Sequence, residues 1–327
     1  MSGEQTIDVG EATVTRVVEW SGPIKTVAEI LPEASPRQWQ AHRELLAPEF
    51  WDPDTGAYLC HIQTWVVRVA GCTILVDTGV GNDRDRPQIP PFAYLRTGFL
   101  DRLAAAGVDS ARVDVVINTH VHYDHVGWNT HLVGGVFVPT FPNATYLVPR
   151  EDYEYFHPDN AANMRPAETT DERRRFAGIR LVFNDSIAPV EQAGQLQLWS
   201  GHHDLPGLPI RLEAAPGHTP GSSLVALRTG QGVLFVGDLL HSPIQILDPD
   251  LRCSFDLDAI QARVTRRRVL ARAAQDGSLL APAHLSGHSA ATIACTGADD
   301  STGYTIDRWA DFPSGPTLPD TDPRRPA

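Results

Sequence analysis

The chain has 327 residues with 42% hydrophobic and 20% charged side chains, an ordinary globular composition that excludes wholesale disorder and a disulfide scaffold. Its formal net charge of −13 argues against a nucleic-acid-binding surface, which needs clustered basic residues. No apolar run approaches the ~20 residues that span a bilayer, and the N-terminus lacks the basic and apolar regions of a signal peptide, so we expect a cytoplasmic protein without membrane contact.

The N-terminal part of the chain carries the pattern of β-strands. A strand is expected over 13–20, and an irregular segment with one short helix over 21–56. The next two β-branched runs flank the dipeptide Ala70-Gly71. Such a dipeptide between two β-branched runs predicts a β-hairpin in which 59–69 pairs with 72–79.

The middle of the chain alternates helix and strand patterns. A short helix is expected over 98–107, with Gly107 as its stop signal. The apolar run 113–120 ends in polar residues, which is typical of a buried strand that delivers a site at its C-terminal end. The polar stretch 149–177 predicts helix with a break at Pro158.

Strand patterns return in the last third of the chain, over 210–217, 222–230, 232–238 and 279–284, and the second and third of these predict a hairpin. The helical pattern over 256–277 is the clearest in the chain. We expect Asp256 to be its N-cap and Gly277 to lie just past its end.

Hairpins beside strand–helix units predict an α/β (α+β) fold of two mixed sheets with outer helices in one domain. We expect a catalytic domain over 58–311. It follows an N-terminal strand and irregular extension over 1–57 that packs on the core. The proline-rich segment 312–327 has the composition of a disordered tail.

One short segment is dense in metal-ligand side chains. His120, His122, Asp124 and His125 lie within six residues, directly after the predicted strand 113–120. Imidazole and carboxylate are the ligands that suit zinc and other first-row divalent metals. Since alternate residues of a turn point in different directions, this one loop is able to serve two metals. A merely polar loop is the weaker interpretation at this density.

Three further ligand-type residues stand at the ends of hydrophobic strands: His218 after 210–217, Asp238 at the end of 232–238, and His284 at the end of 279–284. Loops at strand ends are where sites are built on such scaffolds. Taken singly, each has a structural explanation, such as a helix cap. Their joint placement with the first cluster favours a shared site.

Over about 58–290 the sequence resembles the metallo-β-lactamase superfamily. The resemblance rests on five short motifs in order: D-T-G, H-x-H-x-D-H, P-G-H-T-P-G, G-D and A-H. The resemblance implies a four-layer αβ/βα sandwich with a binuclear metal site. One metal would be held by His120, His122 and His218, the other by Asp124, His125 and His284, and Asp238 would bridge both. Asp77 matches the buried aspartate of the family, which orients the ligand loops or the histidine tautomers without binding the metals.

Within the superfamily the elements are most similar to the methyl parathion hydrolase and N-acyl homoserine lactonase branches. N-acyl homoserine lactonases tend to have tyrosine three residues after the bridging aspartate, where this chain has His241. We expect Asp124 and His241 to take part in catalysis. His241 would polarise the substrate carbonyl or protonate the leaving group, and a structural role near the metals is the alternative.

The resemblance implies a hydrolase that uses a metal-bridging hydroxide to cleave a small-molecule ester or lactone. Two divalent ions are expected, zinc first, with Mn, Fe or Co as alternatives. A phosphotriester, a β-lactam or a thioester of the glyoxalase II type is an alternative substrate. A persulfide dioxygenase with one iron and a non-enzymatic metal-binding module are the alternatives from other classes. We expect no nucleic-acid or membrane partner, and a homodimer is left open.

Overall fold

The structure is a computed structural model, and it describes residues 5–162, 170–297 and 303–312. It divides into two compact units, described separately below. Of the described residues, unit 1 comprises 5–14, 21–61, 201–297 and 303–312, and unit 2 comprises 15–20, 62–162 and 170–200. Within the described residues, no helix has both the length and the apolar character needed to cross a membrane.

The predicted domain limits at 57/58 and 311/312 stay a prediction. Phe312, the first residue of the predicted tail, is buried, and the rest of that tail lies outside the described residues.

An eight-stranded mixed sheet contains the first strands of the chain in the order β1-β2-β4-β5-β6-β9-β10, with β3 paired to β4. Its strands are β1 Thr6–Val9, β2 Ala12–Thr26, β3 Trp51–Asp52, β4 Ala57–Val69, β5 Cys72–Val76, β6 Val115–Ile117, β9 Thr145–Pro149 and β10 Leu196–Trp199. β6 is parallel to both of its neighbours, β5 and β9. A strand flanked in this way is buried on both sides, which explains its unbroken apolar sequence.

The predicted hairpin around Ala70-Gly71 is confirmed. β4 and β5 pair antiparallel from Trp65 opposite Val76 to Val69 opposite Cys72. Both turn residues have positive φ, 50° at Ala70 and 80° at Gly71. A two-residue turn of this kind matches the twist of the strands it joins, and glycine supplies one of the two left-handed positions without strain.

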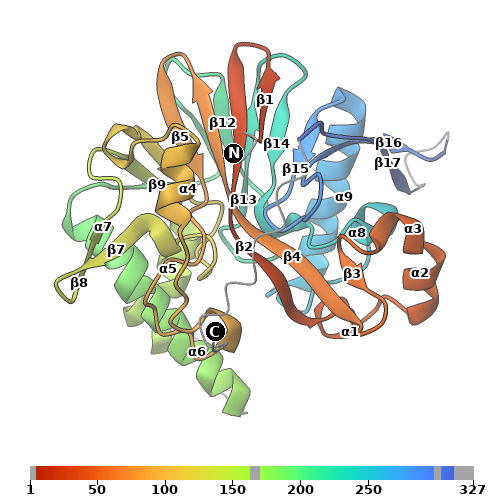
Figure 1. The fold of residues 1–327 in the computed structure, drawn as a ribbon, viewed down its shortest axis with the longest axis horizontal. Helices are drawn as coiled ribbons and strands as arrows, with labels where there is room; N and C mark the ends of the chain where they lie inside the picture. The colour runs from red at the N-terminus through yellow and green to blue at the C-terminus, as the bar shows by residue number, and fades with distance from the viewer. Residues whose placement is uncertain (1–4, 163–169, 298–302, 313–327) are drawn as a thin grey trace. The chain divides into compact units, whose positions relative to one another are not determined.

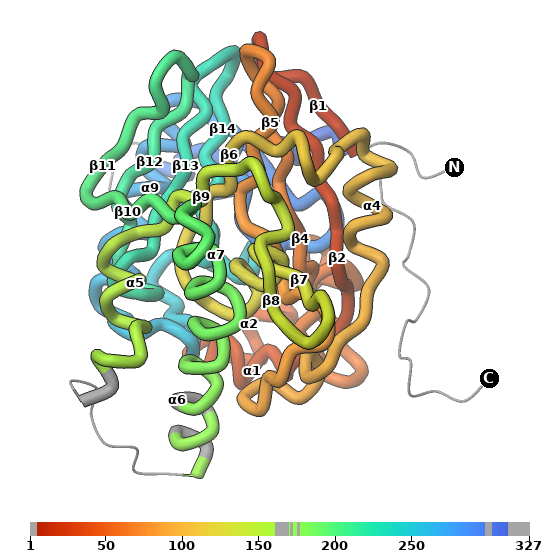
Figure 2. Tube along the Cα trace, turned by 90° about the vertical axis from the view of Figure 1, so that its left-hand side faces the viewer, coloured from red at the N-terminus to blue at the C-terminus, as the bar shows by residue number. Residues whose placement is uncertain are grey.

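Helices of unit 2 pack on its part of this sheet. They are α4 Phe99–Ala105, α5 Arg150–Phe156, α6 Thr170–Val182, the π-helical turn Phe183–Ile187 and α7 Ala188–Gln192. α4 buries Phe99 and Leu103 in one cluster with Leu75 and Val116 of the sheet. Each such side chain contributes about 1.5–3 kcal/mol by leaving water. Figure 2 shows α5 beside β9 and β10, and its Phe156 belongs to a second cluster.

A two-stranded hairpin, β7 Thr130–Val133 with β8 Val136–Pro139, follows the metal-ligand loop in unit 2. Its turn is Gly134-Gly135, and both glycines have positive φ. Each strand has just four residues, which is too short for an alternating pattern to predict it from the sequence.

Unit 1 contains a seven-stranded mixed sheet in the order β11-β12-β13-β14-β15-β16-β17. Figure 2 shows β11 to β14 as neighbouring strands. The strands are β11 His202–Asp204, β12 Ile210–Ala214, β13 Ser223–Leu227, β14 Val233–Phe235, β15 Leu279–Ala281, β16 Ala291–Cys295 and β17 Tyr304–Trp309. The predicted β13–β14 hairpin is confirmed. β14 and β15 run parallel, so their C-terminal ends lie at the same edge.

The long helix of unit 1, α9 Ala259–Asp276, covers one face of this sheet (Figure 1). Its Leu270 and Ala273 share a buried cluster with residues of β13 to β16. Gly277 ends the helix in the left-handed conformation, as predicted. The predicted N-cap was wrong. Asp258 caps the helix by accepting a bond from the Gln261 amide, and Asp256 is used elsewhere.

The segment 21–56 is more regular than predicted. It contains α1 Val27–Ile30, α2 Pro36–Ala41 and α3 Arg43–Leu46, all in unit 1 with α8 Ile244–Leu247. The first two helices each begin with a capping box, in which two side chains bond each other's backbone amides. The pairs are Thr26 with Glu29 in α1 and Ser35 with Gln38 in α2. With these elements, the predicted mixed α/β class with two mixed sheets and helices is confirmed.

Candidate metal centre

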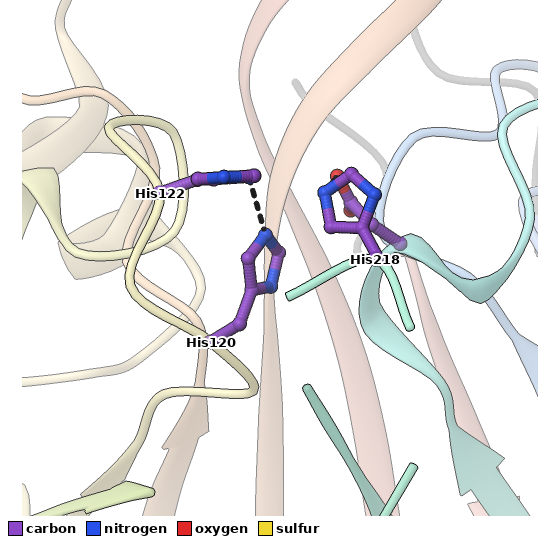
Figure 3. A group of neighbouring side chains, drawn as sticks. His120, His122 and His218 are labelled. Atoms are coloured by element: carbon purple, nitrogen blue, oxygen red, sulfur yellow. Dashed lines mark hydrogen bonds and ion pairs between the residues drawn. The ribbon is translucent and has the colours of Figure 1, made fainter. Parts of the chain in front are cut away.

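In unit 2, the ligand-rich loop leaves the buried end of β6. His120 and His125 are 1% and 0% exposed, and Asp124 is 8% exposed, whereas His122 is half-buried. The Nε2 atom of His120 lies 3.0 Å from Nδ1 of His122, and their rings are nearly perpendicular (Figure 3). The ring centroids of His120 and His125 are 4.0 Å apart. Imidazole nitrogens gathered in this way are typical of a site that holds a divalent cation.

Asp77, at the end of β5, fixes the backbone and side chains of this loop. Its carboxylate accepts bonds from the Thr119 amide at 2.8 Å and the Thr119 hydroxyl at 2.8 Å. It also lies 2.8 Å from Nδ1 of His125. The Thr119 hydroxyl is in turn 3.2 Å from Nδ1 of His120.

The consequence concerns the protons of two rings. Because Asp77 and the Thr119 hydroxyl take the Nδ1 protons of His125 and His120, the lone pairs of both Nε2 atoms are left to bind a metal. Asp77 was predicted to support the ligands, and its contacts fit that role. Thr119 was not predicted, since its part depends on contacts with a residue 42 positions away.

A buried carboxylate joins the loop that follows β5 to the segment that follows the ligand-rich loop. Glu19 is 1% exposed and accepts bonds from the Val80 amide and Trp128 Nε1, each at 2.6 Å. Burial raises the pKa of Glu19, and these bonds offset part of the increase. The backbones approach closely here, because a Cβ on Gly127 would lie 1.9 Å from the carbonyl carbon of Val80. Glycine is therefore required at 127.

A buried guanidinium supports the same loop from its C-terminal side. Arg84 donates to the carbonyl oxygens of Gly127 and Thr130 and pairs with Asp185 at 2.8 Å. Arg86 binds the other oxygen of Asp185, also at 2.8 Å. Burial lowers the pKa of Arg84 to about 10, although Asp185 opposes this, so the group stays charged at neutral pH. The segment that follows the ligands is thus fixed by charged bonds as well as by packing.

In unit 1, Asp238 stands among three histidines. Its Oδ2 lies 3.2 Å from Nε2 of His218 and 3.3 Å from Nε2 of His241. Its Oδ1 lies 3.0 Å from Nε2 of His284. All four side chains are nearly buried, at 3–6% exposed. One carboxylate facing three imidazoles is a second arrangement of metal-binding groups.

The loops that carry these residues leave the sheet of unit 1 at strand ends. His218 follows β12 after Gly217, whose φ is 138° and where a Cβ would lie 2.3 Å from the backbone nitrogen of Ala262. Asp238 follows β14, and His284 follows β15. Nδ1 of His284 lies 3.0 Å from the carbonyl oxygen of His61, which fixes its proton there.

His218 has a second carboxylate partner that sequence reasoning missed. Its Nδ1 lies 3.1 Å from Oδ1 of Asp256. Burial by itself lowers the pKa of His218, but Asp238 and Asp256 together outweigh it and raise that pKa to about 9. Burial lowers the pKa of His241, with Asp238 opposing the change.

The predicted ligands therefore gather within each unit. Side chains with donor atoms able to hold a metal ion are His120, His122, Asp124 and His125 in unit 2, and His218, Asp238 and His284 in unit 1. The two predicted accessory residues join them, since Asp77 contacts His125 and His241 contacts Asp238. The donor set is imidazole and carboxylate throughout, which suits zinc and related divalent ions.

Comparison with known proteins places these residues in a family. The sequence profile of the metallo-beta-lactamase superfamily matches residues 57–284. The N-acyl homoserine lactonase AttM of Agrobacterium fabrum is 41% identical over 63 residues, which are 19% of this chain and 20% of that protein. AttM of Azorhizobium caulinodans is 40% identical over 63 residues, with the same coverage. The chain thus matches about a fifth of the length of these curated relatives.

Solved structures resemble the whole fold. The hydrolase AbOPH of the beta lactamase superfamily superposes with a TM-score of 0.76 at 24% identity, covering 94% of this chain and 97% of that one. AidC, a dizinc quorum-quenching lactonase in complex with a product, gives a TM-score of 0.69 at 20% identity, covering 94% and 98%. The matching profile over most of the chain shows that this protein belongs to the metallo-beta-lactamase superfamily of metal-dependent hydrolases.

Proposed function

We propose that the protein is a hydrolase with two divalent metal ions, which cleaves a carboxylic ester or a lactone. His120, His122 and His218 would hold one ion, Asp124, His125 and His284 the other, and Asp238 would bridge them. Zinc is the first choice, because imidazole and carboxylate ligands suit it, and Mn, Fe or Co is the alternative.

A single observation carries the proposal. Four of the five proposed histidine ligands place Nδ1 against an oxygen atom: the Thr119 hydroxyl for His120, Asp77 for His125, Asp256 for His218 and the His61 carbonyl for His284. Metal-ligating histidines almost always donate the proton of the non-ligating nitrogen to such an oxygen. An ordinary buried histidine also bonds its N–H to an oxygen atom, but here the Nε2 atom of each of the four rings lies within 3.8 Å of another ligand-type side chain.

When bound, two such ions lower the pKa of a water molecule towards neutrality and polarise a carbonyl oxygen. The side chains of this protein supply the rest. Oxygens of Asp124 or Asp238 would accept the proton that the attacking water gives up. The Nε2 of His241 would donate a hydrogen bond to the oxygen on which charge develops. Asp77, Thr119 and Asp256 hold the imidazole rings in one orientation.

The choice of ester or lactone is supported by the relatives. Curated relatives matched over 63 residues are N-acyl homoserine lactonases. AidC is a lactonase found with the product N-hexnoyl-L-homoserine. We therefore propose a lactone, with an acyl-substituted lactone as the first substrate to test.

The test is hydrolysis by zinc-loaded protein of acyl homoserine lactones, aryl esters, a phosphotriester and a β-lactam under one condition. Two zinc ions per chain by elemental analysis and the highest kcat/KM on a lactone or ester are expected. One iron per chain would instead favour the dioxygenase alternative. A higher kcat/KM on the phosphotriester, or zinc-replete protein inactive on every substrate, would contradict the proposal.

Zinc binding should depend on pH through His218. Its pKa of about 9 in the metal-free protein lies above its ordinary value near 6.5, so the ring is protonated at pH 7. Zinc must displace that proton. The apparent zinc affinity should therefore rise by about tenfold per pH unit between pH 7 and 9 and level off above.

Calorimetric titration with zinc at pH 7, in two buffers of different ionisation enthalpy, measures the number of protons released. Release of at least one proton per chain is expected. Equal binding heats in both buffers, with an affinity independent of pH, would contradict the raised pKa of His218.

A further inference from the structure

A buried carboxylate near the start of α9 contacts the proposed ligand His218. Asp256 lies two residues before the helix cap Asp258, and its side chain is 1% exposed. Its Oδ1 lies 3.1 Å from Nδ1 of His218, and its Oδ2 accepts a bond from the Cys253 amide at 3.0 Å. Asp256 therefore does not cap the helix. It is fixed by the backbone on one side and faces an imidazole on the other.

The charge of Asp256 is supported by a buried arginine. The side chains of Asp256 and Arg266 are both buried, at 1% and 0% exposed. Nη2 of Arg266 lies 3.6 Å from Oδ2 of Asp256. An ionised carboxylate that accepts an imidazole proton makes the other ring nitrogen a stronger ligand.

Arg266 also holds the loop that carries Asp238. Its Nε donates to the carbonyl oxygen of Leu239, the residue after Asp238, at 2.8 Å. Its Nη1 donates to the carbonyl oxygens of Pro249 and Leu251, each at 2.8 Å. The guanidinium is fully buried, on a helix whose apolar face packs in the core. One side chain of α9 thus links Asp256, the carboxylate that contacts His218, to the loop that carries Asp238.

We propose that Asp256 and Arg266 are positioning residues of the metal centre. Asp256 fixes the tautomer and the orientation of His218, and Arg266 fixes Asp256 relative to the loop of Asp238, whose Oδ2 lies 3.2 Å from Nε2 of His218. This inference rests on the proposed function, because it assigns the pair a role towards the metals. Neither residue touches the substrate.

The test is zinc affinity, measured by competition with a chromophoric chelator, rather than activity. Asp256→Ala should weaken binding of the zinc ion that His218 would hold by about 10–100-fold, the usual effect of removing the carboxylate partner of a histidine ligand. Asp256→Asn keeps an oxygen that accepts the imidazole proton but loses the charge, so it should restore part of the affinity. Its similar size also keeps the test available if the alanine variant does not fold.

Asp258→Ala is the matched control. It removes a carboxylate two residues away that caps the same helix through the Gln261 amide. It should lower the Tm of the metal-free protein through the lost cap while zinc affinity stays unchanged. A merely structural Asp256 would behave like Asp258, so the difference in zinc affinity between the two alanine variants is the decisive quantity.

Wild-type zinc affinity in both Asp256 variants would overturn the inference, as would an equal loss of affinity in Asp258→Ala. Those results leave the proposed function standing, since the wild-type protein still binds two zinc ions. Failure of the wild-type protein to bind zinc would overturn the proposed function itself, and the inference with it. Arg266→Lys, which loses the forked donor set, should weaken zinc binding in the same direction as Asp256→Ala.

Discussion

Replacing Asp238 with asparagine is expected to lower kcat/KM by at least about 10³-fold, because loss of a shared negative ligand removes several kcal/mol of charge stabilisation. The carboxylate lies within 3.0–3.3 Å of the Nε2 atoms of His218, His241 and His284. An asparagine at this position would have to present its amide to at least one of them. The variant should also retain fewer than two zinc ions per chain.

The fold should survive this substitution. Asp238 lies at the edge of the sheet of unit 1, and the core formed by α9 and β13 to β16 does not depend on it. Circular dichroism and a thermal melt of the metal-free protein check this point. Asp250→Asn is the control, since Asp250 is exposed and pairs with Arg267 at the surface. Two zinc ions per chain and unchanged turnover in Asp238→Asn would contradict the proposal that Asp238 is a metal ligand.

The elements that carry the ligands were predictable from the sequence, because each combines a local apolar run with a polar end. β6, β14 and β15 are short, buried strands, and their sequences are continuous apolar runs. The ligands follow directly, since the loop at the end of a strand is where a scaffold of this kind exposes side chains. The hairpin of β4 and β5 was predictable for the same local reason, through Ala70-Gly71.

Asp77 was implied by the family resemblance, but the other groups that support the ligands were not predictable, because they are defined by contacts between distant parts of the chain. Asp256 is 38 residues from His218. Read locally, it looks like a helix cap, and the true cap lies only two residues later. Two acidic residues before one helix cannot be told apart without the position of His218. Glu19 is 61 residues from Val80, and Arg84 is 43 residues from Gly127, whose backbone groups they bond.

Other differences between the predicted and observed elements involve sequence patterns that are local but too short to predict an element. The segment 21–56 was predicted to be irregular with one short helix, yet T-x-x-E at Thr26 and S-x-x-Q at Ser35 are helix-start patterns that the structure uses. β16 and β17 were not predicted. They pair antiparallel with a register irregularity between Thr292 and Ile293, which interrupts simple alternation of apolar and polar residues.

The second large effect is expected at His241, which should take part in catalysis beside the metals without being a metal ligand. His241→Ala should keep two zinc ions and the fold but lower turnover of a lactone by about 10²–10⁴-fold, the range for a lost acid–base or polarising group. The ring is 3% exposed, and its Nε2 lies 3.3 Å from Asp238. Neither ring nitrogen makes a hydrogen bond of normal geometry to a described residue, which leaves a donor for the substrate.

The backbone of His241 is held independently of its ring. Its amide donates to Gln245 at 2.8 Å, and its carbonyl oxygen accepts from the Tyr58 hydroxyl at 2.6 Å. Tyr58→Phe is therefore the matched control. It loosens the backbone but keeps the imidazole, and it should reduce turnover far less than His241→Ala.

The leaving group identifies what the ring does. Burial lowers the pKa of His241, so the ring is neutral at pH 7 and stabilises a departing oxygen by donating its N–H rather than as a charged acid. A nitrophenolate carries its own charge well, whereas the alkoxide of an opening lactone does not. The loss in His241→Ala should therefore shrink on a nitrophenyl ester. Loss of one zinc ion in the variant would make His241 a ligand, and unchanged turnover on both substrates would leave it a structural residue beside Asp238.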